Sequence, residues 1–135
     1  TETRNNKMKK KILIVIANYY DDISKGLITS AKKELKSNIK ISIIYVPGVF
    51  EIPITIKKNI KKYDGFIALG CVIRGQTPHF DFISKSTTDA IMFLSIEYTK
   101  PIANGILTCL NKNQAIKRKN KGKEAAIALK SVLSQ

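Results

Sequence analysis

Short apolar runs that alternate with amphipathic segments constrain the fold more than any other feature of the sequence. The first run, residues 11–17, is continuously apolar after its initial lysine and rich in β-branched residues. Such a run is typical of a strand that is buried on both faces of a parallel sheet. From Asp21 onward the spacing predicts a helix, with Asp21 or Asp22 available to cap its first turn. The apolar positions of this helix recur at helical intervals: Ile23, Leu27, Ala31 and Leu35.

The same alternation repeats along the chain. Three further runs predict strands, at residues 39–45, 66–73 and 102–108. Two intervening segments predict helices, at residues 50–60 and 81–98. Strands that alternate with helices in this way form parallel βαβ units with right-handed crossovers. The sequence therefore predicts an α/β protein with a four-stranded parallel sheet and helices on both faces.

The segment after the last strand carries two separate apolar stripes. Ala115 and Ile116 belong to the first, and the second runs over residues 125–133. Residues 118–122 contain no apolar side chain that would connect them. One continuous helix would leave a full turn without a buried side, so we expect two helices with a break near residues 119–122.

Length and composition indicate a single domain, residues 1–135, with residues 1–10 as a flexible arm. A chain of 135 residues is large enough for one core and too small for two ordinary domains. No apolar run is long enough to cross a bilayer, and the polar N-terminal segment lacks the apolar core of a secretion signal. We therefore expect a cytoplasmic protein with no membrane partner.

Cys71 and Cys109 are the only cysteines. Both fall in apolar, strand-like surroundings, where a free thiol packs as a small hydrophobic group. Neither has His, Asp or Cys neighbours at the spacing of metal ligands, so we expect no metal site. Two unpaired thiols favour a reducing compartment.

A formal net charge of +14 raises the question of nucleic-acid binding. The lysines are spread over almost every polar segment, and no arginine cluster alternates with exposed aromatics. A base-stacking surface needs such an arrangement, so a nucleic-acid partner is the weaker alternative. The positive field favours instead the approach of a phosphorylated substrate.

Candidate chemistry lies in the loops that follow the strands, because ligands of open parallel sheets bind beyond the carboxyl ends of the strands. His79, the only histidine, stands in the loop before the long helix. Imidazole suits proton transfer near neutral pH, although a lone loop histidine is more often simply solvated. Gln76 and Thr77 precede it at a loop-to-helix junction, where backbone N–H groups either attract anions or form an ordinary turn. The sequence contains no Walker-type or dinucleotide-binding glycine motif.

Two other loop positions have both a structural and a functional explanation. Glu51 either complements the dipole of the helix that begins there or binds polyol hydroxyl groups through its carboxylate. Tyr19, or its neighbour Tyr20, either packs against an adjacent loop or stacks on a planar heterocycle. These residues alone do not decide between the alternatives.

Taken together, these segments resemble the lumazine synthase family, which makes the immediate precursor of riboflavin. The resemblance runs from Ile12 to about Leu133 and rests on five motifs in order. They are VPGVFEIP at residues 46–53, ALGCVIRGQTPHFD at 68–81, NGILT at 104–108, QAIKR at 114–118 and NKGKEAA at 120–126. The resemblance implies a single flavodoxin-like, three-layer α/β/α domain. It also implies a transferase that condenses a ribitylamino-pyrimidine with a four-carbon keto-phosphate and requires no metal or organic cofactor.

The resemblance further implies which residues bind the ribitylamino-pyrimidine. Tyr19 matches the aromatic position that stacks on the pyrimidine ring, where the family usually has phenylalanine or tryptophan. The turn that holds the ribityl chain corresponds to Val49, Phe50 and Glu51. The strand end whose backbone contacts the pyrimidine edge corresponds to Cys71, Val72 and Ile73.

A second group of residues is implied for the keto-phosphate. Gln76 and Thr77 match the phosphate-binding backbone, and His79 matches the proton-transfer histidine. Three residues match positions that the neighbouring subunit contributes in the family: Asn104, Arg118, which pairs with the phosphate, and Lys121.

The implied assembly is a homopentamer, or a multiple of it, with active sites shared between subunits. Between Arg118 and Asn120 the family usually has a longer connection, so Lys117 and Lys119 are alternative partners for the phosphate. A module of the same fold that binds flavin or lumazine without turnover is the alternative function. His79 together with Arg118 argues for the enzyme, because a pure binder needs neither a proton shuttle nor a phosphate cation.

Overall fold

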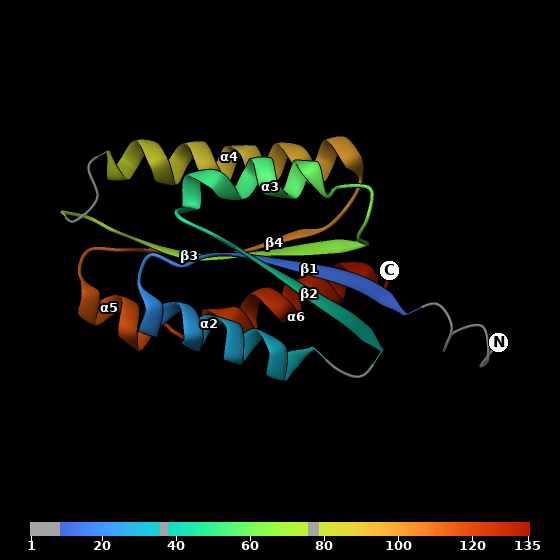
Figure 1. The fold of residues 1–135 in the computed structure, drawn as a ribbon, viewed down its shortest axis with the longest axis horizontal. Helices are drawn as coiled ribbons and strands as arrows, with labels where there is room; N and C mark the ends of the chain where they lie inside the picture. Colours follow the sequence, from blue (N-terminus) through green and yellow to red (C-terminus); the bar gives the residue numbers. More distant parts are fainter. Residues whose placement is uncertain (1–8, 36–37, 76–78) are drawn as a thin grey trace.

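The computed structural model describes residues 9–35, 38–75 and 79–135, which form three layers around a parallel sheet (Figure 1). All neighbouring strands pair in parallel, in the order β2-β1-β3-β4. This order is that of the first four strands of the flavodoxin-like fold and confirms the predicted fold class. The strands are β1 (Lys10–Ala17), β2 (Ile39–Val46), β3 (Gly65–Ile73) and β4 (Ile102–Cys109).

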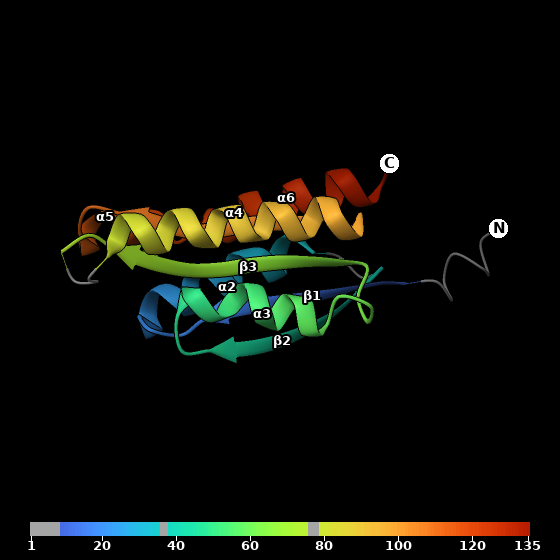
Figure 2. The ribbon, with the colours of Figure 1, turned by 90° about the horizontal axis from the view of Figure 1, so that it is seen from above.

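Helices cover both faces of the sheet, as Figures 1 and 2 show from two sides. One face carries α3 (Ile52–Lys58), which follows the 3-10 turn η1 (Val49–Glu51), and the long helix α4 (Phe80–Tyr98). The other face carries α2 (Asp21–Glu34), α5 (Lys112–Lys117) and α6 (Lys121–Leu133).

The strict alternation of β1 explains why both layers of helices form. Ile12, Ile14 and Ile16 face the core beneath α2 and α6, whereas Leu13 and Val15 face the core beneath α3 and α4. All five side chains are fully buried. Burying one such aliphatic side chain contributes about 1.5–3 kcal/mol, so a single strand stabilises both layers.

The bounds of β2, β3, α4 and β4 differ from the predicted ones by one residue, and three further points differ. The predicted helix over residues 50–60 is a 3-10 turn at Val49–Glu51 followed by a shorter helix, Ile52–Lys58. Tyr20, not an aspartate, occupies the N-cap of α2, and both aspartates lie inside its first turn. The predicted flexible arm overlaps β1, which already begins at Lys10. Residues 1–8 lie outside the described part of the chain.

The predicted break in the last segment is confirmed, but it ends earlier, because α6 begins at Lys121. Residues 118–120 make a tight turn that is held against α2. The hydroxyl of Ser30 donates to the carbonyl oxygen of Lys119 at 3.2 Å. A Cβ atom built on Gly122 would lie 2.1 Å from the carbonyl oxygen of Leu27. Glycine is therefore required where α6 crosses α2.

Within the described ranges, none of the helices combines the length and the apolar character that crossing a membrane requires.

Candidate functional site

The loops after β1 and β3 flank the point where the strand order reverses. From β1 the chain turns through α2 to the edge strand β2, and from β3 it turns through α4 to the opposite edge strand β4. The crevice between two such diverging loops is the usual ligand site of open parallel sheets. Tyr19 follows β1 and His79 precedes α4, so the first group of candidate residues lies where such a crevice is expected.

The ring of Tyr19 is exposed at the first of these loops. Its side chain is 67% exposed, whereas Tyr20 packs against the core beneath α2. The two rings meet edge to face, with centroids 4.8 Å apart and an interplanar angle of 87°. Tyr20 thus supports Tyr19 from one side and leaves ring surface open for stacking.

A glycine in β3 fixes the turn that carries the second set of candidates. Val49 is buried, and a Cβ atom on Gly70 would lie only 2.7 Å from its Cγ1 atom. Val49 therefore anchors η1 directly on β3. Phe50 projects into solvent at 56% exposure, and the Glu51 carboxylate lies beside the Cα of Gly48. Glu51 is the N-cap residue of α3 without a side-chain cap bond, so its carboxylate lies at the helix N-terminus and both explanations of this residue stay open.

The end of β3 offers backbone groups, not side chains. The side chains of Cys71, Val72 and Ile73 are buried. The described pairing of β3 with β1 ends at Leu69, whereas pairing with β4 continues to Ile73. Backbone groups of these three residues that point toward β1 therefore lack a strand partner and are suited to contact the edge of a planar ring.

Cys71 packs as an apolar group, as the sequence predicts. Burial raises the pKa of its thiol to about 12, and the neighbouring thiol of Cys109 adds to this effect. The thiolate, which is the nucleophilic form, is therefore scarce at neutral pH. Both cysteines are free and buried.

We expect Cys71 in a Cys109→Ala variant to react with a thiol reagent at pH 8 at least about 10²-fold more slowly in the native state than in urea, because burial, the largest cause of the raised pKa, remains in this variant. The protonated thiol stabilises the fold fully below about pH 9, and this stabilisation is lost as the pH rises toward 12. Stopped-flow absorbance with a disulfide reagent measures the rate. Equal rates in the two states would contradict the burial of this thiol.

His79 is the N-cap residue of α4 and adopts a left-handed conformation, with φ 63° and ψ 34°. Few residues other than glycine adopt it, and histidine, asparagine and aspartate are the more tolerant ones. The carbonyl oxygen of His79 accepts the first helical bond from the N–H of Ile83 at 2.9 Å. Its side chain is exposed at the carboxyl edge of the sheet. Gln76 and Thr77, the candidate anion-binding residues before it, lie outside the described residues.

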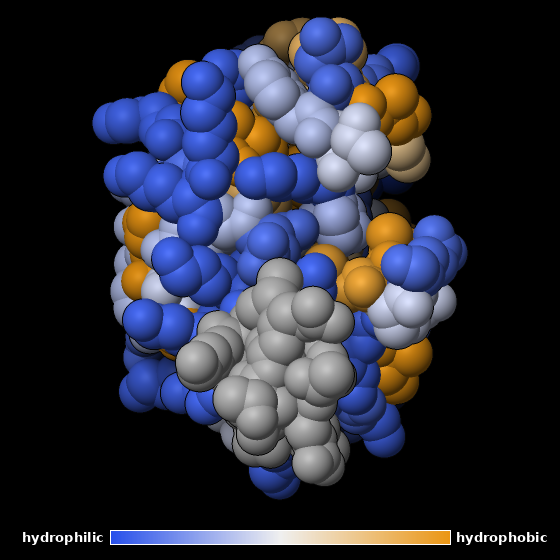
Figure 3. All heavy atoms as spheres, turned by 90° about the vertical axis from the view of Figure 1, so that its right-hand side faces the viewer, coloured by the Kyte–Doolittle hydropathy of each residue, from blue (hydrophilic) through white to orange (hydrophobic). Residues whose placement is uncertain are grey.

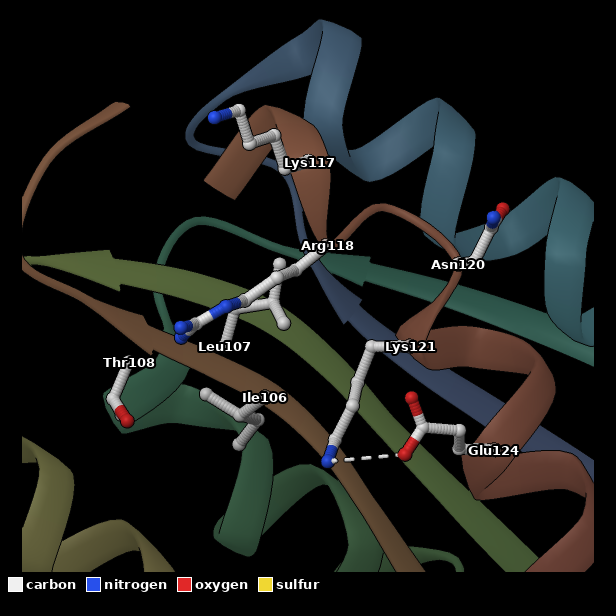
Figure 4. Close-up of a pocket in the computed structure, with 8 residues that line it drawn as sticks. All are labelled: Ile106, Leu107, Thr108, Lys117, Arg118, Asn120, Lys121 and Glu124. Carbon is white, nitrogen blue, oxygen red and sulfur yellow. Dashed lines mark ion pairs between the residues drawn. The ribbon is translucent and has the colours of Figure 1, made fainter. Parts of the chain in front are cut away.

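The second group of candidates lies along the free edge of β4. Arg118 and Lys121 line a hollow of about 410 Å³, which we call the β4-edge hollow. Figure 4 shows the guanidinium of Arg118 extending toward Thr108, while Lys121 pairs with Glu124 at 3.7 Å. The complete lining is Ile106, Leu107, Thr108, Lys117, Arg118, Asn120, Lys121 and Glu124.

Local hydrogen bonds explain how Arg118 reaches this edge. The Asn111 side chain caps α5 by accepting from the N–H of Gln114 at 3.0 Å. The Gln114 carboxamide oxygen accepts in return from the N–H of Leu110 at 2.8 Å. This pair of bonds folds the chain back after β4, and α5 then places Arg118 beside the strand that it has just left.

The structure separates the alternative phosphate partners. Lys117 lines the β4-edge hollow, but its side chain points away from Thr108 (Figure 4). Lys119 lines a different hollow, between α2 and α6. Arg118 is therefore the best-placed cation of the three. Asn104 lies exposed on the same strand edge, where its side-chain oxygen accepts from the N–H of Ile106 at 2.9 Å.

Sequence reasoning assigned no site role to five members of the hollow, which are Ile106, Leu107, Thr108, Asn120 and Glu124. Thr108 is exposed on β4, an edge strand of the sheet. Glu124 stands three positions after Lys121, a helical spacing that signals a contact between opposite charges. Both signals are present in the sequence once β4 is known to be an edge strand.

One chain thus contains two half-sites. Tyr19, η1, the end of β3 and His79 lie at the carboxyl ends of the strands, where the crevice is expected. Arg118 and Lys121 line the β4-edge hollow, and Asn104 lies on the same strand, β4, outside that lining. None of the crevice residues belongs to the lining of the β4-edge hollow.

Comparison with known proteins identifies the family. Residues 9–135 match the family model of 6,7-dimethyl-8-ribityllumazine synthase. The chain is 46% identical to the 6,7-dimethyl-8-ribityllumazine synthase of Bartonella henselae, over 89% of this chain and 84% of that protein. It is 38% identical to the protein of the same name from Ruthia magnifica, over 93% of this chain and 84% of that protein. The chain belongs to the 6,7-dimethyl-8-ribityllumazine synthase family of transferase enzymes.

Proposed function

We propose that the protein condenses 5-amino-6-(D-ribitylamino)uracil with 3,4-dihydroxy-2-butanone 4-phosphate. The product is 6,7-dimethyl-8-ribityllumazine, and phosphate and water are released. The matched family and the relatives are named as synthases of this product, and these names support the reaction. The observation that carries the proposal is the β4-edge hollow, in which Arg118 and Lys121 offer two cations beside the hydroxyl of Thr108.

The crevice residues would bind the pyrimidine. The exposed ring of Tyr19 is suited to stacking on the heterocycle, and the β1-facing backbone of Cys71, Val72 and Ile73 is suited to its polar edge. The turn Val49–Glu51 would hold the ribityl chain, with the Glu51 carboxylate as an acceptor for its hydroxyl groups.

The keto-phosphate would bind between this crevice and a β4-edge hollow. A guanidinium grips phosphate through two parallel hydrogen bonds, which lysine does not reproduce. Gln76 and Thr77 would add backbone N–H groups, and His79 would move protons as the amine joins the ketone, phosphate leaves and the ring closes. Holding both reactants in the right orientation would supply much of the rate.

The two half-sites would be completed by neighbouring subunits of a homopentamer. Four large apolar side chains of α4 support such an assembly, because they are exposed and share one stripe of the helix. They are Phe82, Met92, Phe93 and Ile96. In this arrangement Asn104, Arg118 and Lys121 would reach the crevice of the next copy.

Two finer points complete the proposal. The free, buried cysteines fit a reducing compartment, which supports a cytoplasmic location.

A module that binds flavin or lumazine without turnover is the competing function. It would need a stacking ring such as Tyr19, but it would have no use for the cations of the β4-edge hollow.

The decisive experiment mixes the purified protein with both substrates and follows the fluorescence of the lumazine product. Product that forms in proportion to protein concentration supports the enzyme. Binding of the pyrimidine without product formation would support the non-catalytic module instead.

We expect Arg118→Ala to raise the KM for the keto-phosphate about 10- to 100-fold, the effect of losing a charged hydrogen-bond pair. The KM for the pyrimidine should change far less. Steady-state kinetics with each substrate varied in turn measures both values.

Lys117→Ala is the matched control, because it removes one charge from the same hollow at a side chain that points away from Thr108. This variant should leave both KM values within about 3-fold of wild type. Equal increases of the two KM values in Arg118→Ala would argue against a phosphate role for Arg118.

A further inference from the structure

A second cationic hollow lies at the opposite end of the sheet, beside the amino ends of β1 and β2. It encloses about 380 Å³, within the size range of small-molecule sites. Figure 3 views the molecule from this end and shows hydrophilic residues over most of the visible face. We call it the amino-end hollow, and its lining is Lys11, Lys40, Ser42, Lys61, Lys62 and Tyr63.

The hollow exists because α3 is short. Alternate residues of β1 and β2 face the side of the sheet that α3 covers, and Lys11 and Ser42 belong to this set. The helix ends at Lys58, and Figure 2 shows that it stops before the amino ends of the two strands. The turn that follows α3 then brings Lys61 and Lys62 over the uncovered strands.

Among the described residues, the four lysines of the amino-end hollow form no salt bridge with an acidic side chain. Lys11 and Lys40 are paired positions of adjacent strands, so their side chains leave the sheet side by side. The salt bridges among the described residues are Lys25–Asp21, Lys85–Asp89, Lys121–Glu124 and Lys130–Glu34, and none involves this hollow.

One nearby carboxylate, that of Asp64, offsets at most one of the four positive charges. The carboxylate of Asp64 accepts from the backbone N–H of Lys11 at 2.7 Å and is not part of the lining. Lys100 donates to the carbonyl oxygens of Ile60 and Tyr63, which fixes the turn in place. By contrast, Glu124 lines the β4-edge hollow, and Asp22 and Glu34 line the hollow between α2 and α6.

We propose that the amino-end hollow binds the oligophosphate group of a small molecule, such as a diphosphate or triphosphate chain. Like charges at adjacent positions repel, and an anion placed between them removes that cost. The four positive charges of these lysines match the negative charge of several linked phosphates better than the charge of a single phosphate. Lysine ammonium groups act as mobile point charges, which suits a flexible phosphate chain, and the hydroxyl groups of Ser42 and Tyr63 add neutral donors.

This site is separate from the proposed substrate site, because none of its residues belongs to the crevice or to the β4-edge hollow. Its ligand therefore need not be the keto-phosphate. The test uses an Arg118→Ala background, in which the other candidate phosphate site has lost its guanidinium.

Isothermal titration with sodium tripolyphosphate at low ionic strength measures the affinity. Adding Lys40→Gln and Lys62→Gln to this background should weaken binding about 10-fold or more, because two of the four charges are removed. The matched control adds Lys32→Gln and Lys112→Gln, two exposed lysines that are not in the lining of this hollow, and should keep the affinity within about 2-fold.

Equal losses in the two double variants would overturn the proposal, because binding would then follow net charge alone. The absence of tripolyphosphate binding in the Arg118→Ala background would overturn it as well. A third arm replaces tripolyphosphate by a single-stranded RNA oligomer. If RNA binds and depends on Lys40 and Lys62 while tripolyphosphate does not bind, the small-molecule class is wrong.

Discussion

Replacing His79 by alanine is expected to lower kcat by about 10²- to 10⁴-fold, the usual contribution of a positioned general acid–base group. The affinity for the pyrimidine should remain within about 2-fold, because Tyr19, η1 and the end of β3 are untouched. No second histidine exists in the chain to take over the role. Single-turnover kinetics gives the rate, and equilibrium fluorescence titration gives the affinity.

The left-handed backbone of His79 calls for a second variant. Alanine in this conformation adds strain of about 1 kcal/mol, so part of any loss in His79→Ala comes from a displaced loop. Asparagine tolerates the same backbone and lacks the imidazole. His79→Asn should therefore keep the melting temperature of the wild type and still lose most of the turnover. Near-normal kcat in this variant would remove His79 from the chemistry.

Gly122→Ala is expected to destabilise the fold by about 3 kcal/mol or more, at the upper end of overpacking effects. The added Cβ atom meets the carbonyl oxygen of Leu27 at 2.1 Å and the N atom of Ala31 at 3.0 Å. These are backbone atoms of α2 and have little freedom to move away. In an uncrowded helix the same change would stabilise by about 0.5–1 kcal/mol, so the expected sign is reversed. Urea denaturation followed by circular dichroism measures the free energy of unfolding.

Lys123→Ala provides the comparison for this variant. It lies next in sequence on α6, is exposed and should change the free energy of unfolding by no more than about 0.5 kcal/mol. Any displacement of α6 also moves Lys121, so Gly122→Ala should raise the KM for the keto-phosphate in the protein that remains folded. Unchanged stability in Gly122→Ala would mean that the two helices do not approach as closely as described.

The order and type of the elements could be predicted because the strands are buried on both faces. β3 shows the clearest signal, since all nine of its residues are buried and the run is apolar throughout. The helix after β2 was harder to delimit. Residues 50–60 have apolar positions at helical spacing, but Val49 must lie flat on Gly70, which forces a 3-10 turn before the regular helix begins.

The break in the last segment shows what the spacing of apolar residues can and cannot predict. A polar stretch between two apolar stripes predicts an interruption, and the structure has one. The position of the break depends on the contact of Gly122 with α2. This tertiary contact does not change the spacing of apolar residues in the sequence. For this reason α6 starts at Lys121, inside the predicted break.

Candidate site residues were predictable where they follow a strand directly. Tyr19 and the end of β3 are of this kind, because the carboxyl ends of parallel strands meet at one edge. Thr108 and Glu124 were missed because their exposure depends on β4 being an edge strand. The meeting of Arg118 with His79, by contrast, is proposed as a property of the assembly, since in one chain they belong to different half-sites.

The burial of β3 has a consequence for how the molecule opens. This strand is paired on both sides over residues 66–69, so its amide hydrogens there exchange with solvent only when the sheet itself comes apart. The turn at residues 118–120 lies outside the sheet and is held to α2 through the bond from Ser30 to Lys119, so its amide hydrogens exchange once that local contact opens. The doubly paired part of β3 is thus the slowest to open. The wall proposed for the flat heterocycle, Cys71 to Ile73, continues from it but pairs with β4 alone.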